Sequence, residues 1–251
     1  SVNATNDGLV AGGKPVMTPA EEAAERARLA LQETASVTSV LGYTFLYDER
    51  DDPIEPKAGY RFSVSQDLAG LGGDKKYLRT EAQFDWYQRI WGDDFVLTTS
   101  FNAGHIMGWG DEELFLNDRF FKGGGSFRGF ETSGVGPRDI ISGTSIGGEL
   151  FAIGTLELSI PNPLPEDLGI KTSIFADFGT IGLVDALPAG NCAVGASLCI
   201  EDDLSLRATV GASVSWNSPF GPVRLDFSHV LANEDYDRPE EFRFSAGTKL
   251  N

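Results

Sequence analysis

The stretch LSLRATVGASVSW, residues 204–216, alternates between apolar and polar side chains without an exception. Successive side chains of a β-strand point to opposite faces, so this period of two predicts one long strand. The predicted apolar face carries Leu204, Leu206, Ala208, Val210, Ala212, Val214 and Trp216, and the polar face carries Ser205, Arg207, Thr209, Gly211, Ser213 and Ser215. Such a strand separates an apolar environment from a polar one.

The same period continues on either side of this stretch. Residues 77–90 alternate likewise, with a polar face made of Arg79, Glu81, Gln83, Asp85 and Arg89. Several segments exceed the roughly 5 or 6 residues of soluble strands and match the roughly 9 to 11 that a tilted strand needs to cross a bilayer. We predict about nine strands, at residues 39–48, 60–67, 77–90, 95–107, 145–160, 170–180, 204–216, 222–230 and 241–250.

The connections between these strands alternate in length. Residues 92–94, 161–169 and 217–221 form short turns, whereas residues 108–144, 181–203 and 231–240 form long loops. Outer-membrane barrels have this asymmetry, with short turns on the periplasmic side and long loops outside. We therefore predict an all-β fold, a transmembrane antiparallel β-barrel. A soluble β-sandwich, which would turn the polar face to water, is the alternative.

The composition restricts the classes of partner. The chain has 251 residues and a formal net charge of −17, with no cluster of Lys and Arg. Nucleic acid binding depends on basic side chains that displace counterions, so we expect no nucleic acid partner. No stretch approaches the roughly 18 uninterrupted apolar residues that a membrane helix requires.

Two cysteines, Cys192 and Cys199, lie close together in a loop rich in Gly and Ala. This spacing favours a local disulfide in an oxidising compartment over a metal site. We expect the disulfide and no metal.

Near the N-terminus one helix is expected. Thr18 and Glu21 form a capping box with Pro19 at the first helical position, and residues 20–33 are good helix formers. Few apolar residues lie on one side of this helix, so we predict a short surface helix within a loop. A helix that binds a partner or lies on the membrane is the alternative.

The longest loop contains the run GGGSFRGFETSGVGPRD, residues 123–139. This run closely resembles the signature of the BamA family of outer-membrane barrel proteins. Further stretches resemble the final strands and turns of that family: TLELSIPNP at 155–163, IFADFGTIG at 174–182, VSWNSPFGPVRLDF at 214–227 and EEFRFSAGT at 240–248. The resemblance covers most of the chain from about residue 39 onward. It implies that the loop folds back into the barrel and places an Arg-Gly-aromatic tip, Arg128, Gly129 and Phe130, against the inner wall.

The physical chemistry of the loop agrees with this resemblance. Alternation places Glu157 and Asp177 on the polar faces of their strands, pointing inward. An arginine carried into the lumen loses hydration and needs carboxylate partners, so we expect Arg128 to pair with both acids, as the resemblance also implies. The neighbouring glycines, Gly123, Gly124, Gly125 and Gly129, would let the backbone turn tightly and approach the wall.

These residues allow two other interpretations. A glycine-rich run can cradle phosphate, but this one lacks the Gly-Lys-Ser or Gly-Lys-Thr ending. Glu157 and Asp177 could form a catalytic carboxylate pair, but the nearby arginine favours a structural pair. The only histidines, His105 and His229, fall on apolar faces, where a hydrolase base would be wrongly aimed. An outer-membrane hydrolase is therefore only a minor alternative, and we expect no catalytic residues.

The last predicted strand places Phe242, Phe244 and Leu250 on one face. It resembles the C-terminal signal that barrels of this family present to the assembly machinery. The family normally ends on an aromatic residue, whereas this sequence ends Lys249, Leu250, Asn251.

About nine strands do not make the even, closed barrel of a bacterial outer-membrane protein. Members of the family have about sixteen strands preceded by POTRA domains. We therefore expect residues 1–38 to be an extracellular loop segment with a short helix, and residues 39–251 to be the C-terminal part of the barrel.

The resemblance implies a function in folding and inserting other β-barrel proteins into the outer membrane, without cofactor and without enzymatic chemistry. The implied partners are unfolded outer-membrane proteins, the accessory lipoproteins of the assembly complex, and outer-membrane lipid and lipopolysaccharide. The alternative is a related POTRA-barrel translocator, of the TamA or two-partner secretion type, that exports dedicated clients. A passive porin is a third class.

Overall fold

A computed structural model describes residues 10–11, 14–15, 37–92, 94–110, 114–165, 168–184, 199–218 and 221–247 of the chain. Nine long antiparallel strands form one sheet, in the order β14-β13-β12-β10-β9-β6-β5-β4-β3. Neighbours in the sheet follow one another along the chain, apart from the short strands between them. The nine are β3 Val40–Asp48, β4 Gly59–Ala69, β5 Tyr77–Trp91, β6 Phe95–Gly108, β9 Leu150–Ile160, β10 Ile170–Gly182, β12 Arg207–Ser218, β13 Gly221–Ala232 and β14 Phe242–Ala246.

The remaining described elements are short. β7 Arg138–Asp139 pairs with β8 Thr144–Ser145 and with β11 Ile200–Glu201, and β1 Val10–Ala11 pairs with β2 Lys14–Pro15. Two 3₁₀ turns, Leu116–Asp118 and Gly124–Ser126, lie in the connection between β6 and β9. None of the helices among the described residues is long and apolar enough to cross a membrane. The helix predicted at residues 20–33 lies outside the described residues.

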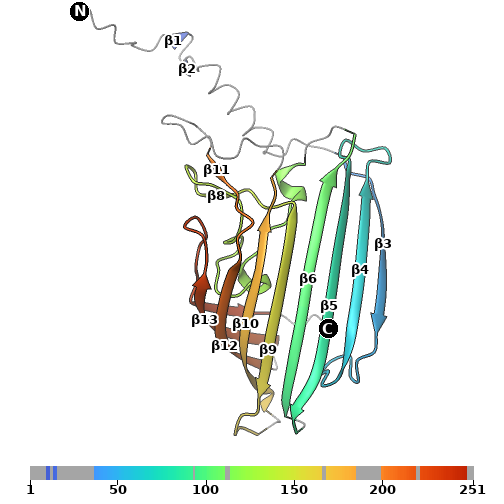
Figure 1. Ribbon diagram of the computed structural model, residues 1–251, viewed down its shortest axis with the longest axis vertical. Helices are drawn as coiled ribbons and strands as arrows, with labels where there is room; N and C mark the ends of the chain where they lie inside the picture. The colour runs from blue at the N-terminus through green and yellow to red at the C-terminus, as the bar shows by residue number, and fades with distance from the viewer. Residues whose placement is uncertain are drawn as a thin grey trace, which may run out of the picture.

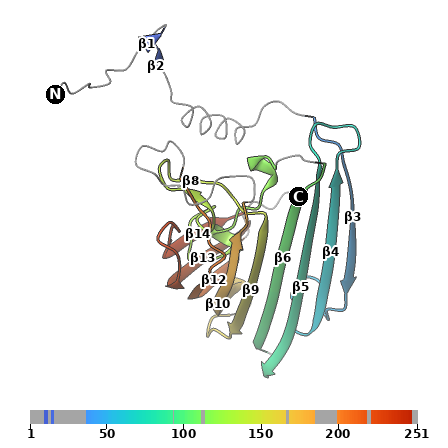
Figure 2. The ribbon, with the colours of Figure 1, turned by 45° about the horizontal axis from the view of Figure 1, so that its top comes forward.

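The sheet is bent into a trough (Figure 1), and the turned view in Figure 2 shows the connection between β6 and β9 on its inner side. In the described residues the sheet is open, with β3 at one edge and β14 at the other. We call the face toward the β6–β9 connection the inner face and the opposite face the outer face.

All nine predicted strands are confirmed, but three of their boundaries were wrong by three residues or more. The last strand was predicted to run to residue 250, whereas β14 ends at Ala246. The strand predicted from residue 145 begins at Leu150, because Thr144–Ser145 pairs with Arg138–Asp139 and Gly147 turns the chain with φ of 69°. The strand predicted from residue 204 begins at Arg207. The Arg207 guanidinium donates to the carbonyl oxygens of Asp203 and Ser205, at 2.8 and 3.0 Å, and so draws these residues out of the sheet.

The outer face is apolar and uncovered by any described segment. Large side chains on it include Phe227, which is 51% exposed, together with Tyr43, Phe45, Phe62, Phe84, Trp86, Phe101, Leu156, Ile174, Phe178, Val210, Trp216, Phe242 and Phe244. The inner face carries buried polar residues such as Asp85, Asp177, Ser213 and Asp226. A soluble sandwich would bury its apolar face, so this distribution argues against the sandwich alternative.

The buried apolar core lies on the inner face. The β6–β9 connection supplies Leu114, Phe120, Phe127, Phe130 and Val135, and the strands supply Ile106, Phe151, Ile153 and Ile181. The rings of Phe120 and Phe151 meet edge to face with centroids 4.7 Å apart, as do those of Phe127 and Phe130 at 5.2 Å. The long connection is thus packed into the trough.

A buried ion pair fixes the connection between β13 and β14. Arg207 is 0% exposed, and its Nε donates to Asp237 Oδ2 at 2.9 Å while Nη2 donates to the Tyr236 hydroxyl at 2.9 Å. Asp237 also accepts hydrogen bonds from the backbone N–H groups of Gly136 and Glu234. This one carboxylate therefore joins β12, the β6–β9 connection and the β13–β14 connection.

Replacing Asp237 by Asn in the full-length protein should strongly lower its thermal stability. The Arg207 charge would remain buried without compensation, and loss of one partner of such a pair costs about 3–5 kcal/mol. Thermal unfolding followed by gel mobility measures the effect. The matched control is Asp235→Asn in the same loop, where the side chain is exposed. Equal stability of the two variants would contradict a structural role for this pair.

Candidate functional site

The tip of the β6–β9 connection depends on glycine at particular positions. Gly123, Gly124 and Gly129 have φ of 127°, 61° and 90°, values that side chains disfavour. A Cβ atom on Gly129 would lie 2.7 Å from Thr209 Cγ2 of β12, so only glycine lets the backbone approach the wall this closely. Gly125 has ordinary φ and open space around it, so the third glycine of the run is not required by its backbone.

Arg128, at this tip, reaches the two predicted acids. Its Nε and Nη2 donate to Asp177 Oδ2 and Oδ1 at 2.8 and 2.7 Å, and Nη1 donates to Glu157 Oε2 at 2.5 Å. Its backbone N–H also donates to Asp177, at 3.2 Å, and its carbonyl oxygen accepts from the Thr209 hydroxyl at 2.9 Å. The structure thus brings together the residues that the sequence suggested, with the two-pronged geometry that suits a guanidinium and a carboxylate.

The surroundings of Arg128 strengthen this contact. The side chain is only 6% exposed, and its guanidinium carbon lies 3.6 Å from the centroid of the Phe175 ring. A cation over an aromatic face is stabilised most when water is excluded. Ser173 Oγ donates to the other Glu157 oxygen, Oε1, at 2.8 Å, and so orients this carboxylate. Both acids are engaged by hydrogen bonds, an arrangement that suits a structural lock better than a hydrolytic pair.

Backbone pairing attaches the same loop to the connection that precedes β14. Glu131 N donates to Arg238 O at 2.9 Å, Arg238 N to Gly134 O at 2.8 Å, and Glu240 N to Gly129 O at 2.9 Å. Phe130, which is fully buried, forms an isolated bridge with Pro239. The Arg243 guanidinium of β14 lies over Gly124, where a Cβ atom would be 3.1 Å from its carbon. The loop therefore contacts the wall and also the approach to the last strand.

Sequence reasoning missed several residues of this site. Phe175 and Thr209 contact Arg128, and Arg224 contacts Glu157. All three lie on inner faces that alternation already indicated, since Phe175 pairs with Glu157 across the β9–β10 ladder. Alternation predicts the face on which a side chain lies, but it does not predict which inward side chains contact one another across the trough.

Beneath the loop lies a cavity of about 530 Å³ with charges of both signs. Its acids are Asp85, Glu157, Asp177 and Asp226, and its cations are Lys122, Arg128 and Arg224. Among the described residues no group of three or more His, Cys, Asp or Glu side chains is arranged to hold a metal ion.

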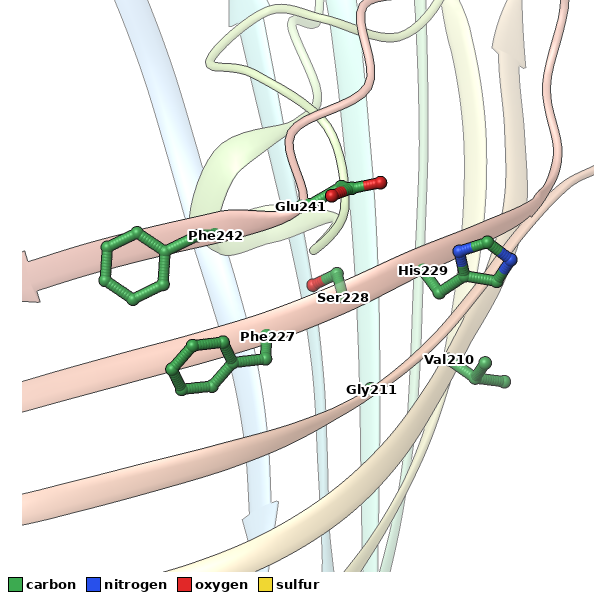
Figure 3. Close-up of a pocket in the computed structure, with 7 residues that line it drawn as sticks. All are labelled: Val210, Gly211, Phe227, Ser228, His229, Glu241 and Phe242. Atoms are coloured by element: carbon green, nitrogen blue, oxygen red, sulfur yellow. The ribbon is translucent and has the colours of Figure 1, made fainter.

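A second hollow, of about 490 Å³, lies along β12, β13 and β14 where the pairing of β14 stops (Figure 3). Ser228, His229 and Glu241 line it together with Val210, Gly211, Phe227 and Phe242. Ser228 and His229 are consecutive in β13 and so point to opposite faces, which does not suit a hydrolytic triad. His105 and His229 both lie on the outer side of their strands, as expected from their positions.

The predicted C-terminal strand is present as β14, paired with β13 from Val223 to Phe227. Phe242 and Phe244 point to the outer face, and the Phe242 ring lies 5.1 Å from that of Phe227. Leu250 lies outside the described residues.

Cys199 is buried and disulfide-bonded, and its predicted partner Cys192 lies outside the described residues. The Cys199 N–H donates to Asp139 Oδ1 at 3.1 Å. Burial would raise the pKa of the Asp139 carboxyl, but hydrogen bonds from Ser142, Cys199 and Ile141 outweigh burial and lower this pKa. Asp139 thus anchors the short sheet above the core as a carboxylate.

The sequence of the chain is similar to those of known proteins. The chain is 31% identical over 208 residues to the outer membrane protein assembly factor BamA of Neorickettsia risticii, covering 83% of the chain and 27% of that protein. It is 31% identical over 153 residues to the human sorting and assembly machinery component 50 homolog, covering 58% of the chain and 32% of that protein. The chain thus spans about a quarter to a third of the length of these curated relatives.

A solved structure shares the fold. The crystal structure of BamA from Haemophilus ducreyi lacking POTRA domains 1-3 superimposes with a TM-score of 0.69 at 24% identity, covering 82% of the chain and 41% of that structure. The family model described as the Omp85 superfamily domain matches residues 11–250. This match covers most of the chain, and the described residues form a nine-stranded antiparallel sheet with an arginine-tipped loop packed on its inner face; the chain belongs to the Omp85 superfamily.

Proposed function

We propose that this chain forms the wall and the inner loop of an outer-membrane barrel that folds and inserts other β-barrel proteins. The observation that carries the proposal is the lock between Arg128 and the acids Asp177 and Glu157. Relatives named as an outer membrane protein assembly factor and as a component of the sorting and assembly machinery support it.

Placement in the bacterial outer membrane, with multiple strands crossing it, is part of this proposal. The outer face supports it, because its large apolar side chains lie in the open and would contact lipid. Trp91, which is 79% exposed, lies at the end of β5 beside the ring of Phe95, where aromatic rings would meet the headgroups.

The proposed mechanism lowers a folding barrier and involves no covalent chemistry and no cofactor. An edge strand presents unpaired N–H and C=O groups, and an extended client segment can pair with it by β-augmentation. The locked loop would hold the inner wall rigid while the edges of the barrel part. The proposed partners are unfolded outer-membrane proteins, accessory lipoproteins of the assembly complex, and outer-membrane lipid and lipopolysaccharide.

Replacing Arg128 by Ala should loosen the barrel, because Asp177 would keep a buried charge without its cation, at a cost of about 3–5 kcal/mol. Arg128→Lys should also destabilise, since an ammonium group cannot donate to both carboxylates in the geometry of the fork. Gel mobility after heating measures the shift. Lys171→Ala, which removes an exposed ion pair with Glu55, is the control and should change stability by less than about 1 kcal/mol. Unchanged behaviour of Arg128→Ala would refute the lock.

Depletion of the full-length protein in its own cell tests the function itself. If it assembles barrels in general, all other outer-membrane barrels should fall together while unfolded precursors accumulate in the periplasm. Quantitative proteomics of the outer-membrane and periplasmic fractions measures both. Loss of a single secreted client with the other barrels unchanged would instead identify a dedicated transporter of the same superfamily.

A further inference from the structure

Arg224 of β13 also contacts the lock, through Glu157 of β9. Its Nε donates to Asp226 Oδ1 at 2.8 Å, and its Nη2 donates to Ser213 Oγ at 3.0 Å and to Glu157 Oε2 at 3.3 Å. The side chain is 37% exposed, whereas Asp226 is buried and also bonds Ser213 Oγ. Asp226 of β13 thus holds Nε, while Nη2 at the tip contacts both Ser213 of β12 and Glu157 of β9.

The contact between Arg224 and Glu157 spans the curved wall. In the sheet, β10 and β12 lie between β9 and β13, so the two residues belong to strands three positions apart. Neighbouring strands lie about 4.8 Å apart, which places β9 and β13 roughly 14 Å apart along the sheet. Their side chains meet directly only because the sheet is bent, and the ion pair in turn opposes flattening of this part of the wall.

Glu157 is shared between this contact and the loop. The same oxygen, Oε2, accepts from Arg128 at 2.5 Å and from Arg224 at 3.3 Å. Asp177, Arg128, Glu157, Arg224 and Asp226 therefore form one row of alternating charge that runs from β10 through the loop to β13. Loss of either arginine changes the position and the electrostatic balance of the carboxylate on which the other depends.

We propose that Arg224 is a positioning residue. It couples the bound position of the loop that carries Arg128 to the curvature of the wall from β9 to β13. Arg224 pairs with Ser245 in the β13–β14 ladder, so the curvature that it holds also sets the place of the edge strand β14. The inference rests on the proposed function for its consequence, since β14 matters for assembly only if its edge receives clients. The coupling itself is a property of the folded wall and is measured separately.

Hydrogen–deuterium exchange on the full-length protein in lipid bilayers tests the coupling. The reporters are loop amides with backbone hydrogen bonds, at Gly124, Glu131 and Gly134. Arg224→Gln should speed their exchange by roughly threefold to tenfold. The loop protects these amides when it is bound to the wall, and a loop that is bound less tightly opens more often. Arg224→Lys keeps the charge but donates from a single nitrogen, so it should give a smaller increase and partly rescue protection.

A double-mutant comparison separates coupling from a local packing defect. In the Glu157→Gln background, Arg224→Gln should add little further exchange in the loop, because the shared carboxylate is already neutral. Lys171→Gln is the matched control, since its ion pair with Glu55 is exposed and has no link to Arg128; it should leave the loop unchanged. If Arg224→Gln fails to fold, Arg224→Lys replaces it in both backgrounds.

Unchanged loop exchange in the Arg224 variants, or equal effects with and without Glu157→Gln, would overturn the coupling. Faster loop exchange that disappears in the Glu157→Gln background supports it. Because these readouts do not depend on any client, they stay separate from the depletion experiment, whose outcome bears on the proposed function alone.

Discussion

A guanidinium that is taken out of water must keep its charge compensated, and the inner half of this structure is arranged around that constraint. Asp177 and Glu157 come from neighbouring strands, so Arg128 can meet both only when β9 and β10 are in register and the loop tip has entered the trough. A misplaced loop would leave Arg128 and Asp177 without charged partners in a poorly hydrated space and would remove one of the two arginines that contact Glu157. The electrostatic requirement thus selects one position of the loop and one register of the wall.

The apolar part of the loop has the complementary task of filling space. A sheet whose apolar face points outward has little core of its own on the inner side, and the strands alone would leave Phe151, Ile153 and Ile181 uncovered. Phe127, Phe130 and Val135 of the loop bury these side chains and are themselves fully buried. Charge pairing sets where the loop lies, while apolar burial provides most of the free energy that keeps it there.

The strands were predictable from the sequence because one face of each is apolar and the other is polar, and side chains of a strand alternate between the two faces. The predicted boundaries were wrong where tertiary contacts bind backbone groups that would otherwise pair in the sheet. Arg207, for example, binds the carbonyl oxygens of Asp203 and Ser205. The Arg128 pair followed from alternation and from the resemblance. Arg224 did not, because its meeting with Glu157 depends on the curvature of the sheet, which no local pattern encodes.

The apolar outer face also affects how the chain behaves in water before it folds. Side chains such as Phe101, Phe178 and Phe227 lie on the outside of the finished sheet, so collapse in water can bury them only in non-native contacts. In water, the unfolded polypeptide would therefore tend to bury these side chains by aggregating. With the proposed placement in the outer membrane, this chain would itself need chaperones before it folds in the bilayer, so it would meet the same difficulty that it is proposed to relieve in other barrel proteins.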